Sequence, residues 1–318
     1  MTERTRRALS AIVLLVLLGL VPWGASVMGE PFYVKLFIRI MIFAIAAVSL
    51  DLILGFGGMV SFGHAAYLGV GAYAVGICVA YEIESGWLHL VMVILVSAAV
   101  AAVIGALCLR TSGVYFIMIT LAFSQMLFFL GVSVKQFGGD DGMTLNATST
   151  FFGAELGRGR PPLRLYYTVL AVLAACLAFG HQLVDSRFGR VIRGIKSNER
   201  RMRAIGYAVD RYKLVAFIIA GTMCGLAGGL AANLEQYVSP SQMHWTHSGK
   251  LMVMVILGGM QSLVGPVIGT IAFLMLEEWL SSLTQHWQII MGPMLLVLVL
   301  FARRGLYGLI AGRSNGHG

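Results

Sequence analysis

Residues 36–80 read LFIRIMIFAIAAVSLDLILGFGGMVSFGHAAYLGVGAYAVGICVA, two long apolar runs divided by glycines. A membrane helix needs about 20 apolar residues, which each run supplies. The dividing segment is too rich in glycine for a stable straight helix, because it contains Gly55, Gly57, Gly58 and Gly63. Non-helical backbone at membrane depth needs protein or a water-filled cavity to satisfy its polar groups. The stretch therefore predicts two membrane helices joined by a break, which is either a tight turn or a border of a solute pathway.

Apolar runs of this kind recur along the 318 residues, of which 58% are hydrophobic and 12% charged. Soluble domains carry about 25% charged residues, so lipid must cover much of this chain. The runs lie at about 9–28, 36–54, 59–80, 87–109, 114–134, 165–184, 213–235, 249–259, 264–283 and 287–302. We expect residues 1–318 to form a single all-α transmembrane domain, a polytopic helical bundle of about ten spans with some broken or short segments.

The net charge of +9 indicates membrane orientation rather than nucleic-acid binding, because the basic residues lie between apolar runs. The 185–213 loop carries nine Lys or Arg residues and three acids, and is predicted to be cytoplasmic. Both termini are placed on that side by Arg4, Arg6, Arg7, Arg303, Arg304 and Arg313. The loops at Glu82 and at 135–164 then lie outside, although Lys135, Arg158, Arg160 and Arg164 depart mildly from the rule.

The N-terminal run admits two interpretations. Arginines precede it and Gly24, Ala25 and Ser26 follow it, as in a signal peptide. With many spans downstream, an uncleaved first helix is the favoured prediction, and a mature N-terminus near residue 27 would contradict it.

Ionisable residues within apolar runs are costly and are therefore candidates for function. Asp51 and His64 are two of them, although hydrogen bonding to backbone near the interface is the simpler interpretation. Candidates for a translocation path cluster at the glycine-rich breaks: Gly57, Gly58, Ser61, Gly63, His64, Gly258 and Gly259. The echo between GGMVSF (57–62) and GGMQSL (258–263) hints at two related halves, but six positions leave the matter open.

Other residues predict structure rather than chemistry. Gly221, Gly225 and Gly229 recur every four residues, as in close helix packing. The four cysteines fall within apolar runs and predict buried side chains, with no disulfide framework. His244 and His247 have no evident third partner for a metal. Gly249-Lys250 lacks the upstream Gly and following Ser or Thr of a phosphate-binding loop, so any driving ATP must bind another chain.

The 185–213 loop alternates apolar and basic residues, which predicts a short basic amphipathic helix. Asn198 can cap a second helix with Glu199 at its positive end, and Gly206 can end that helix. Such a helix pair suits docking to a partner. A solvated charge cluster that only sets orientation is the alternative.

The sequence resembles the LivM-type permeases of branched-chain amino acid ABC importers. The resemblance rests on LGFGGMVSFGHAAYLGVGAY (54–73), DSRFGRVIRGIKSNERRMRAIG (185–206), YKLVAFIIAGTMCGLAGGL (212–230), VSP (238–240) and VMVILGGMQSLVGPVIG (253–269), about a third of the chain. Two departures are Ser197, where an acid commonly precedes Asn-Glu, and GGMQS in place of the usual GGxGS or GGxGT. Arg200, Arg201 and Met202 also replace smaller residues.

The resemblance implies a type II-like ABC importer permease in the bacterial inner membrane. It implies three kinds of partner besides lipid: a second, related permease, two ATP-binding subunits that hold ATP and Mg, and a periplasmic solute-binding protein. The chain itself needs no cofactor. Residues 199–206 are expected in the ATPase groove, and the implied coupling residues are Phe188, Gly189, Arg190, Asn198, Glu199, Ala204 and Gly206. The resemblance implies least about the identity of the solute, since related permeases move urea, amides or aromatic acids.

Two other functions remain to be compared. A secondary transporter needs acids within its spans for a coupling ion, and Asp51 is thin support; uptake without neighbouring ATPases would favour it. An intramembrane enzyme needs a nucleophile with a base or a metal cluster, and Ser61 with His64 has no clear third member. The chain is therefore expected to be a transporter subunit with no ATPase site of its own.

Overall fold

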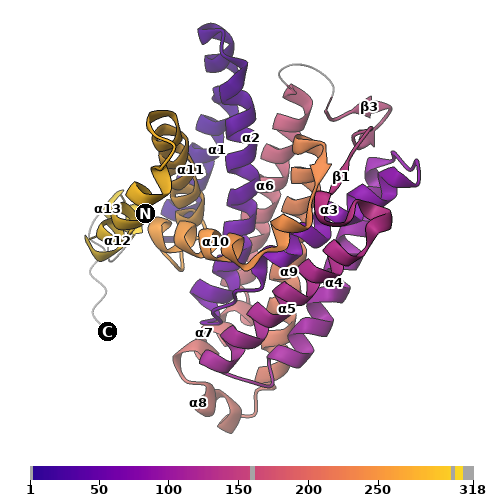
Figure 1. Cartoon of the computed structure of the whole chain (residues 1–318). Coiled ribbons are helices and arrows are strands. Elements are labelled where there is room, and N and C mark those ends of the chain that lie inside the picture. The colour runs from indigo at the N-terminus through magenta and orange to yellow at the C-terminus, as the bar shows by residue number, and fades with distance from the viewer. Residues whose placement is uncertain (1–2, 158–161, 302–304, 311–318) are drawn as a thin grey trace.

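The computed structural model describes residues 3–157, 162–301 and 305–310, which form a helical bundle with two very small sheets (Figure 1). Seven helices in this part are long and apolar enough to cross a membrane. They are α1 (Glu3–Met28), α2 (Pro31–Asp51), α4 (Gly86–Cys108), α5 (Val114–Ser133), α6 (Leu163–Asp185), α9 (Val209–Glu235) and α11 (Gly265–Leu283). The expected all-α membrane bundle is confirmed.

Three predicted runs correspond to shorter helices: α3 (His64–Ala80), α10 (Trp245–Gly258) and α12 (Trp287–Phe301). Helix α13 (Gly305–Ile310) follows α12 along the chain. Ten crossings stay a prediction, because these three are shorter than the seven long helices. Five of the arginines used to predict orientation lie outside the described residues, namely Arg158, Arg160, Arg303, Arg304 and Arg313.

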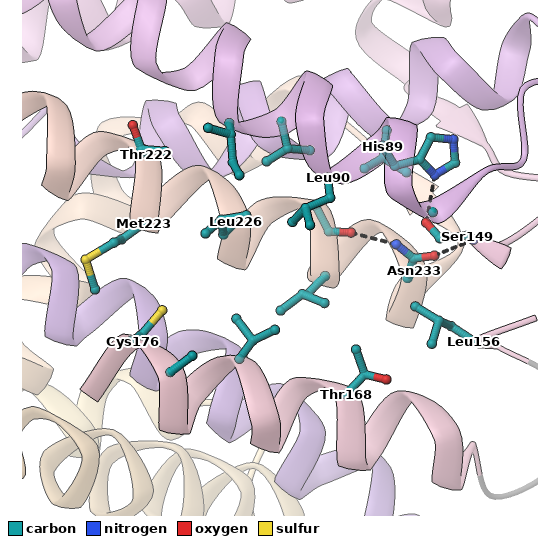
Figure 2. A pocket seen from close by; sticks show the side chains of 18 of the residues that line it. His89, Leu90, Ser149, Leu156, Thr168, Cys176, Thr222, Met223, Leu226 and Asn233 are labelled. Carbon is teal, nitrogen blue, oxygen red and sulfur yellow. Dashed lines mark hydrogen bonds between the residues drawn. The ribbon is translucent and has the colours of Figure 1, made fainter. Parts of the chain in front are cut away.

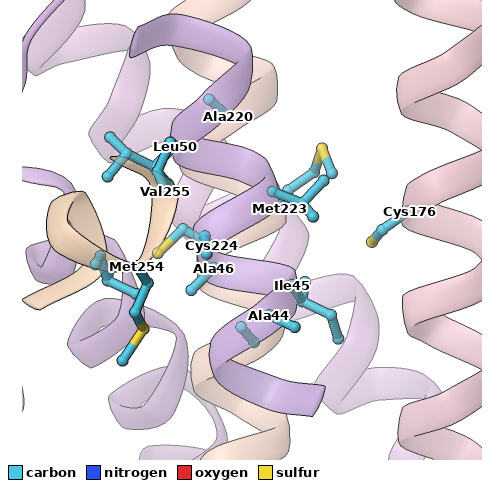
Figure 3. Close-up of a cluster of buried hydrophobic side chains, with 14 of the residues drawn as sticks. Ala44, Ile45, Ala46, Leu50, Cys176, Ala220, Met223, Cys224, Met254 and Val255 are labelled. Carbon is cyan, nitrogen blue, oxygen red and sulfur yellow. The ribbon is translucent and has the colours of Figure 1, made fainter. Parts of the chain in front are cut away.

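Helix α2 lies at the centre of the molecule. Of the residues in an apolar 18-residue window, 83% are buried in protein for α2, against 22% for α1 and 17% for α5. A helix that is apolar on every side is stable only when every side is covered, and α2 packs against α1, α6, α9, α10 and α11. Figure 3 shows Ala44, Ala46 and Leu50 of α2 among side chains of α9 and α10. The small residues of α2 let its neighbours approach closely.

Glycine packing joins α9 to α3 and α4. A Cβ added at Gly225 would overlap the Ser97 side chain of α4, and one added at Gly71 of α3 would overlap the Gly225 carbonyl oxygen. Gly221 faces Ala101 at 2.8 Å, and Gly229 faces Val93 at 3.1 Å, again measured from an added Cβ. The glycines spaced by four on α9 thus lie in packed interfaces, as close backbone approach requires.

The two polar ends of the bundle are built differently (Figure 1). At one end, α7 (Arg187–Ser197) and α8 (Glu199–Ala204) form a short hairpin. At the other, β1 (Met143–Thr144) pairs antiparallel with β4 (Tyr237–Val238), and β2 (Thr150–Phe151) with β3 (Ala154–Glu155). Thr150 N donates to Glu84 O at 2.8 Å, so the loop at 81–85 and the 135–164 loop share one end. Short 3-10 turns at Lys135–Phe137 and Gly139–Asp141 complete this end, and the 3-10 turn Pro240–Met243 packs against α3 and α5.

Candidate functional site

The glycine-rich break begins where α2 loosens into a π-helical turn, Leu52–Phe56. Residues 57–63 then leave the helix, and α3 starts at His64. Gly58 adopts φ +70°, a conformation that a side chain would strain. Backbone hydrogen bonds within the break satisfy some of its polar groups, since Gly58 N donates to Leu54 O at 3.1 Å and Met59 N donates to Ile53 O at 2.8 Å. Irregular turns of this kind within helices recur at functional sites.

A second break, between α10 and α11, lies against the first. Gly259 has φ +108° and Gln261 has φ +67°. The Gln261 backbone N–H donates to Oδ1 of Asp51 at 3.0 Å, which joins the end of α2 to the α10–α11 turn. A Cβ at Gly55 would overlap that carboxylate and lie 2.8 Å from Gln261 N. The residues just before the first echo segment therefore contact the second echo segment.

His64 and Ser61 are buried in protein. His64 Nε2 lies 2.8 Å from Ser49 Oγ of α2, and Ser49 Oγ also donates to Ala46 O at 2.7 Å. Ser61 Oγ accepts from Gly63 N at 3.3 Å. The Ser49–His64 contact ties α2 to the start of α3, and the hydrogen-bond partner of His64 Nε2 is Ser49 rather than Ser61.

The predicted path candidates divide into two groups. Gly57 and Gly58 border a cavity of about 450 Å³. The other five lie against protein: a Cβ at Gly63 would meet Thr120 O of α5 at 2.6 Å, and one at Gly258 would overlap Gly265 O. Gly259 lies against Gly305, since a Cβ added to Gly305 would overlap Gly259. Only the 57–58 pair thus borders open space among the cavities described here.

That cavity opens at the end of the bundle that carries α7 and α8. Its apolar wall includes Val60, Phe116 and Ile117, and its charged rim consists of Lys196, Glu199 and Lys213. The turn between α4 and α5 closes the remaining side through Thr111, Ser112 and Gly113. The cavity is therefore bordered by the glycine-rich break, by the α4–α5 turn and by residues of the hairpin.

Helix α7 is amphipathic, as predicted. Ser186 caps it by accepting from Gly189 N at 3.2 Å. Its apolar face is buried through Val191, Ile192 and Ile195. On the polar side, Arg193 Nη2 donates to Val184 O at 3.0 Å and so braces the junction with α6. The helix is consequently seated on the bundle by one face, with basic residues along the other.

Helix α8 also begins and ends where the sequence predicts. Asn198 Oδ1 accepts from Arg201 N at 2.9 Å, which is the capping contact. Gly206 follows the helix with φ +96°. Unlike α7, α8 has no buried residue. It projects as a structured but solvent-facing element.

Four charged side chains hold the hairpin to the start of α9. Glu199 pairs with Lys213 at 2.6 Å and with Arg203 at 3.0 Å, and Arg203 also pairs with Asp210 at 2.6 Å. Burial opposes ionisation of Glu199, but hydrogen bonds from Lys213 and Arg203 outweigh it and lower the pKa of its carboxyl. The network is ionised and intact at neutral pH.

Lys196 connects the hairpin to the break. Its Nζ donates to Gly55 O at 2.5 Å across 141 residues of sequence. Nothing in the sequence pattern marks Lys196 apart from the other basic residues of the loop. Only the fold, which brings the last turn of α7 beneath the π-helical turn, reveals the contact.

A larger cavity of about 560 Å³ lies between α4, α6 and α9 (Figure 2). Its walls are almost entirely apolar, including Leu90, Met223 and Leu226. Near one end, His89 Nδ1 lies 2.7 Å from Ser149 Oγ, and Asn233 Oδ1 accepts from Ser149 N at 2.8 Å. Sequence reasoning missed this cavity because apolar side chains that line a space look like any others in a membrane helix.

Chemistry-bearing clusters are sparse in the described ranges. No group of three or more His, Cys, Asp or Glu residues there could hold a metal. The four cysteines are free and buried. The main features of the described residues are thus a glycine-rich break, a charged hairpin of α7 and α8, and the two cavities.

Comparisons with known proteins agree with this picture. The family described as the permease component of the branched-chain amino acid transport system matches residues 32–300. The high-affinity branched-chain amino acid permease LivM of Salmonella typhimurium is 25% identical over 287 residues, 84% of this chain and 68% of LivM. LivH of Escherichia coli is 23% identical, over 84% of this chain and 91% of LivH. The L-arabinose ABC transporter permease AraH of Azospirillum brasilense is 25% identical, over 65% of this chain and 61% of AraH. No solved structure matches the chain significantly.

Proposed function

The chain belongs to the family of branched-chain amino acid transport system permease components, and from this premise we propose that it carries branched-chain amino acids or related small solutes across the inner membrane. It is a multi-pass permease subunit of an ABC importer, as the LivM relatives are. The AraH relative, named for a sugar, shows that the same architecture serves other solutes. The solute class therefore rests on the LivM and LivH relatives.

The proposed assembly has four kinds of component. LivM and LivH are two permeases of one transport class, which supports pairing of this chain with a second, related permease. Two ATP-binding subunits supply the energy, and a periplasmic binding protein delivers the solute. Alternating access follows when ATP-dependent closure of the ATPase pair favours one conformation of the permease.

The hairpin of α7 and α8 is the proposed ATPase-docking surface. The observation that carries this role is the exposed apolar pair at its tip: Ile205 is 64% exposed and Tyr207 is 41% exposed. They follow α8, whose four charged residues point to an aqueous setting rather than lipid. Exposed apolar side chains rimmed by charge mark interaction sites. The nine basic residues of 185–213 support a cytoplasmic location.

An Ile205→Glu variant tests this role. It places a charge where an apolar groove is expected, so association with the ATP-binding subunits should weaken at least tenfold, about 1.4 kcal/mol. Co-purification from membranes and ATP-dependent uptake of labelled leucine measure the effect. Labelled urea and amides, assayed in parallel, decide the solute.

Phe152→Glu is the matched control, because Phe152 is 92% exposed and lies between β2 and β3, outside the hairpin of α7 and α8. It should leave ATPase co-purification unchanged. Equal co-purification of the I205E variant and the wild type would remove the hairpin tip from the docking surface. Uptake that persists without the ATP-binding subunits would contradict the importer mechanism itself.

A further inference from the structure

We propose that Lys196 is the positioning residue through which motion of the docking hairpin reaches the membrane interior. Lys196 on α7 contacts the glycine-rich break, and that break in turn contacts the second break between α10 and α11. This inference rests on the proposed function, because a partner must move the hairpin for the link to act. What it adds is a single side chain that makes the connection.

Lys196 makes two contacts with the break, one through its ammonium and one through its stem. The Lys196 ammonium donates to the Gly55 carbonyl at 2.5 Å. Its stem lies against Gly58, where an added Cβ would stand 3.0 Å from Lys196 Cγ. Side chain and break are thus in contact at both the polar and the apolar portion of the lysine.

The Gly55 carbonyl is a suitable acceptor. It lies in the last residues of the π-helical turn, and carbonyls at a helix C-terminus lack an intrahelical partner and carry partial negative charge. The neighbouring carbonyls of Ile53 and Leu54 are already bonded to Met59 N and Gly58 N. A cation reaching in from α7 satisfies the carbonyl that the turn leaves over.

Gly55 also lies against the residues that join the first break to the second. On its other side, the Asp51 carboxylate accepts from Gln261 N at 3.0 Å, and no space remains for a Gly55 side chain. The sequence of contacts runs from α7 through Lys196 to the first break, and from there to the second. Packed elements of this kind shift between discrete arrangements rather than deform continuously.

Lys196 can be altered without dismantling the hairpin. The apolar face of α7 still lies on the π-helical turn, because Phe188 and Ile192 share a small apolar pocket with Leu52 and Phe56. Lys196 itself is exposed to solvent. Methionine in its place keeps most of the stem over Gly58 but removes the ammonium. Lys196→Met therefore deletes the polar link selectively.

The experiment compares four versions of the reconstituted complex in liposomes: wild type, Lys196→Met, Lys196→Arg and Lys35→Met. Lys35 is exposed at the start of α2, far along that helix from the break, and serves as the control. The readout is solute transported per ATP hydrolysed, together with co-purification of the ATP-binding subunits. The K196M variant should lose at least threefold in this ratio with co-purification unchanged. The K196R variant, which can still donate to the carbonyl, should retain more than K196M, and K35M should match the wild type.

A smaller loss in K196M overturns the proposal, as does loss of co-purification, which would assign Lys196 to docking instead. If the wild-type complex shows no ATP-dependent uptake, the proposed function fails, and the Lys196 link is then tested by a distance measurement alone.

Spin labels at Arg201→Cys and Met260→Cys measure the distance between the hairpin and the α10–α11 break, because Met260 is 47% exposed and the native cysteines are buried. The distance should keep one narrow distribution with and without ATP when Lys196 is present and broaden in K196M. A distance that changes with ATP in the wild-type background overturns the link.

Discussion

At the scale of single residues, Gly55 shows why a side chain in the break is costly. Its backbone is enclosed by the Asp51 carboxylate, the Gln261 N–H and the Lys196 ammonium. Glycine is commonly discussed for its conformational freedom, but Gly55 has no positive φ. Space is the constraint here, as it is for Gly71 and Gly225 in the α3–α9 contact.

Gly55→Ala should lower the stability of the purified protein by about 1–3 kcal/mol, the usual cost of overpacking. The added methyl must displace either the carboxylate or the α10–α11 turn. A thiol-reactive dye measures unfolding on heating, because the four cysteines are buried until the bundle opens.

Gly24→Ala is the matched control, since an added Cβ at Gly24 of α1 meets nothing within 4 Å. Alanine there should be neutral or stabilising by up to about 1 kcal/mol, because it favours helix. Equal midpoints for the G55A and G24A variants would show that the break has room that the structure does not reveal.

At the scale of elements, helix α8 is a short structured unit stabilised by its cap and by ion pairs, whereas α7 buries an apolar face. Helix α8 has only six residues and no buried side chain. An isolated helix of that length is unstable in water. Its order therefore depends on the Asn198 cap and on the network formed by Glu199, Arg203, Asp210 and Lys213.

This dependence makes the hairpin sensitive to acid. The pKa of Glu199 is lower in the folded protein than its ordinary value of 4.5, so the pairing stabilises the hairpin fully above that value. The contribution is lost as pH falls through the lower, folded-state pKa. Hydrogen exchange of α8, corrected for intrinsic rates, should be constant from neutral pH down to about 5 and accelerate below about 4.5.

Glu199→Gln supplies the control for the acid effect. The amide keeps the shape of the side chain but cannot titrate, so α8 should exchange faster than in the wild type at neutral pH and show a weaker response to acid. An identical acid response in both proteins would assign the effect to another group.

At the scale of the whole molecule, the fold sorts its connecting segments between two ends. The 185–208 hairpin and the α4–α5 turn lie at one end, while the 81–85 loop and the small sheets lie at the other. We expect the first end to be cytoplasmic because of its basic residues. Polar chain between membrane helices must reach water on one side or the other.

Single cysteines in a background without the native four test this orientation. Glu155→Cys and Arg201→Cys place thiols at exposed positions of opposite ends. A membrane-impermeant maleimide added to intact spheroplasts should label position 155 and spare 201, and permeabilised membranes should label both. The reverse pattern would invert the molecule and with it the proposed docking role.

The local features of the molecule could largely be predicted from the sequence. Periodic apolar runs predicted an all-α membrane bundle because only helices satisfy the backbone in lipid at that length. The caps at Asn198 and Gly206 were predicted because capping depends on residues a few positions apart. Membership of the permease family was predicted from motifs that cover about a third of the chain, and it is confirmed.

The tertiary structure alone decided which of these segments meet. That Lys196 lies beneath Gly55, that Asp51 bonds Gln261, and that apolar faces of α4, α6 and α9 leave a cavity depend on contacts across many residues of chain. Secondary structure is specified by neighbours a few residues apart, whereas these contacts are specified by how helices pack, and an apolar or basic residue has the same sequence signature wherever its helix comes to rest.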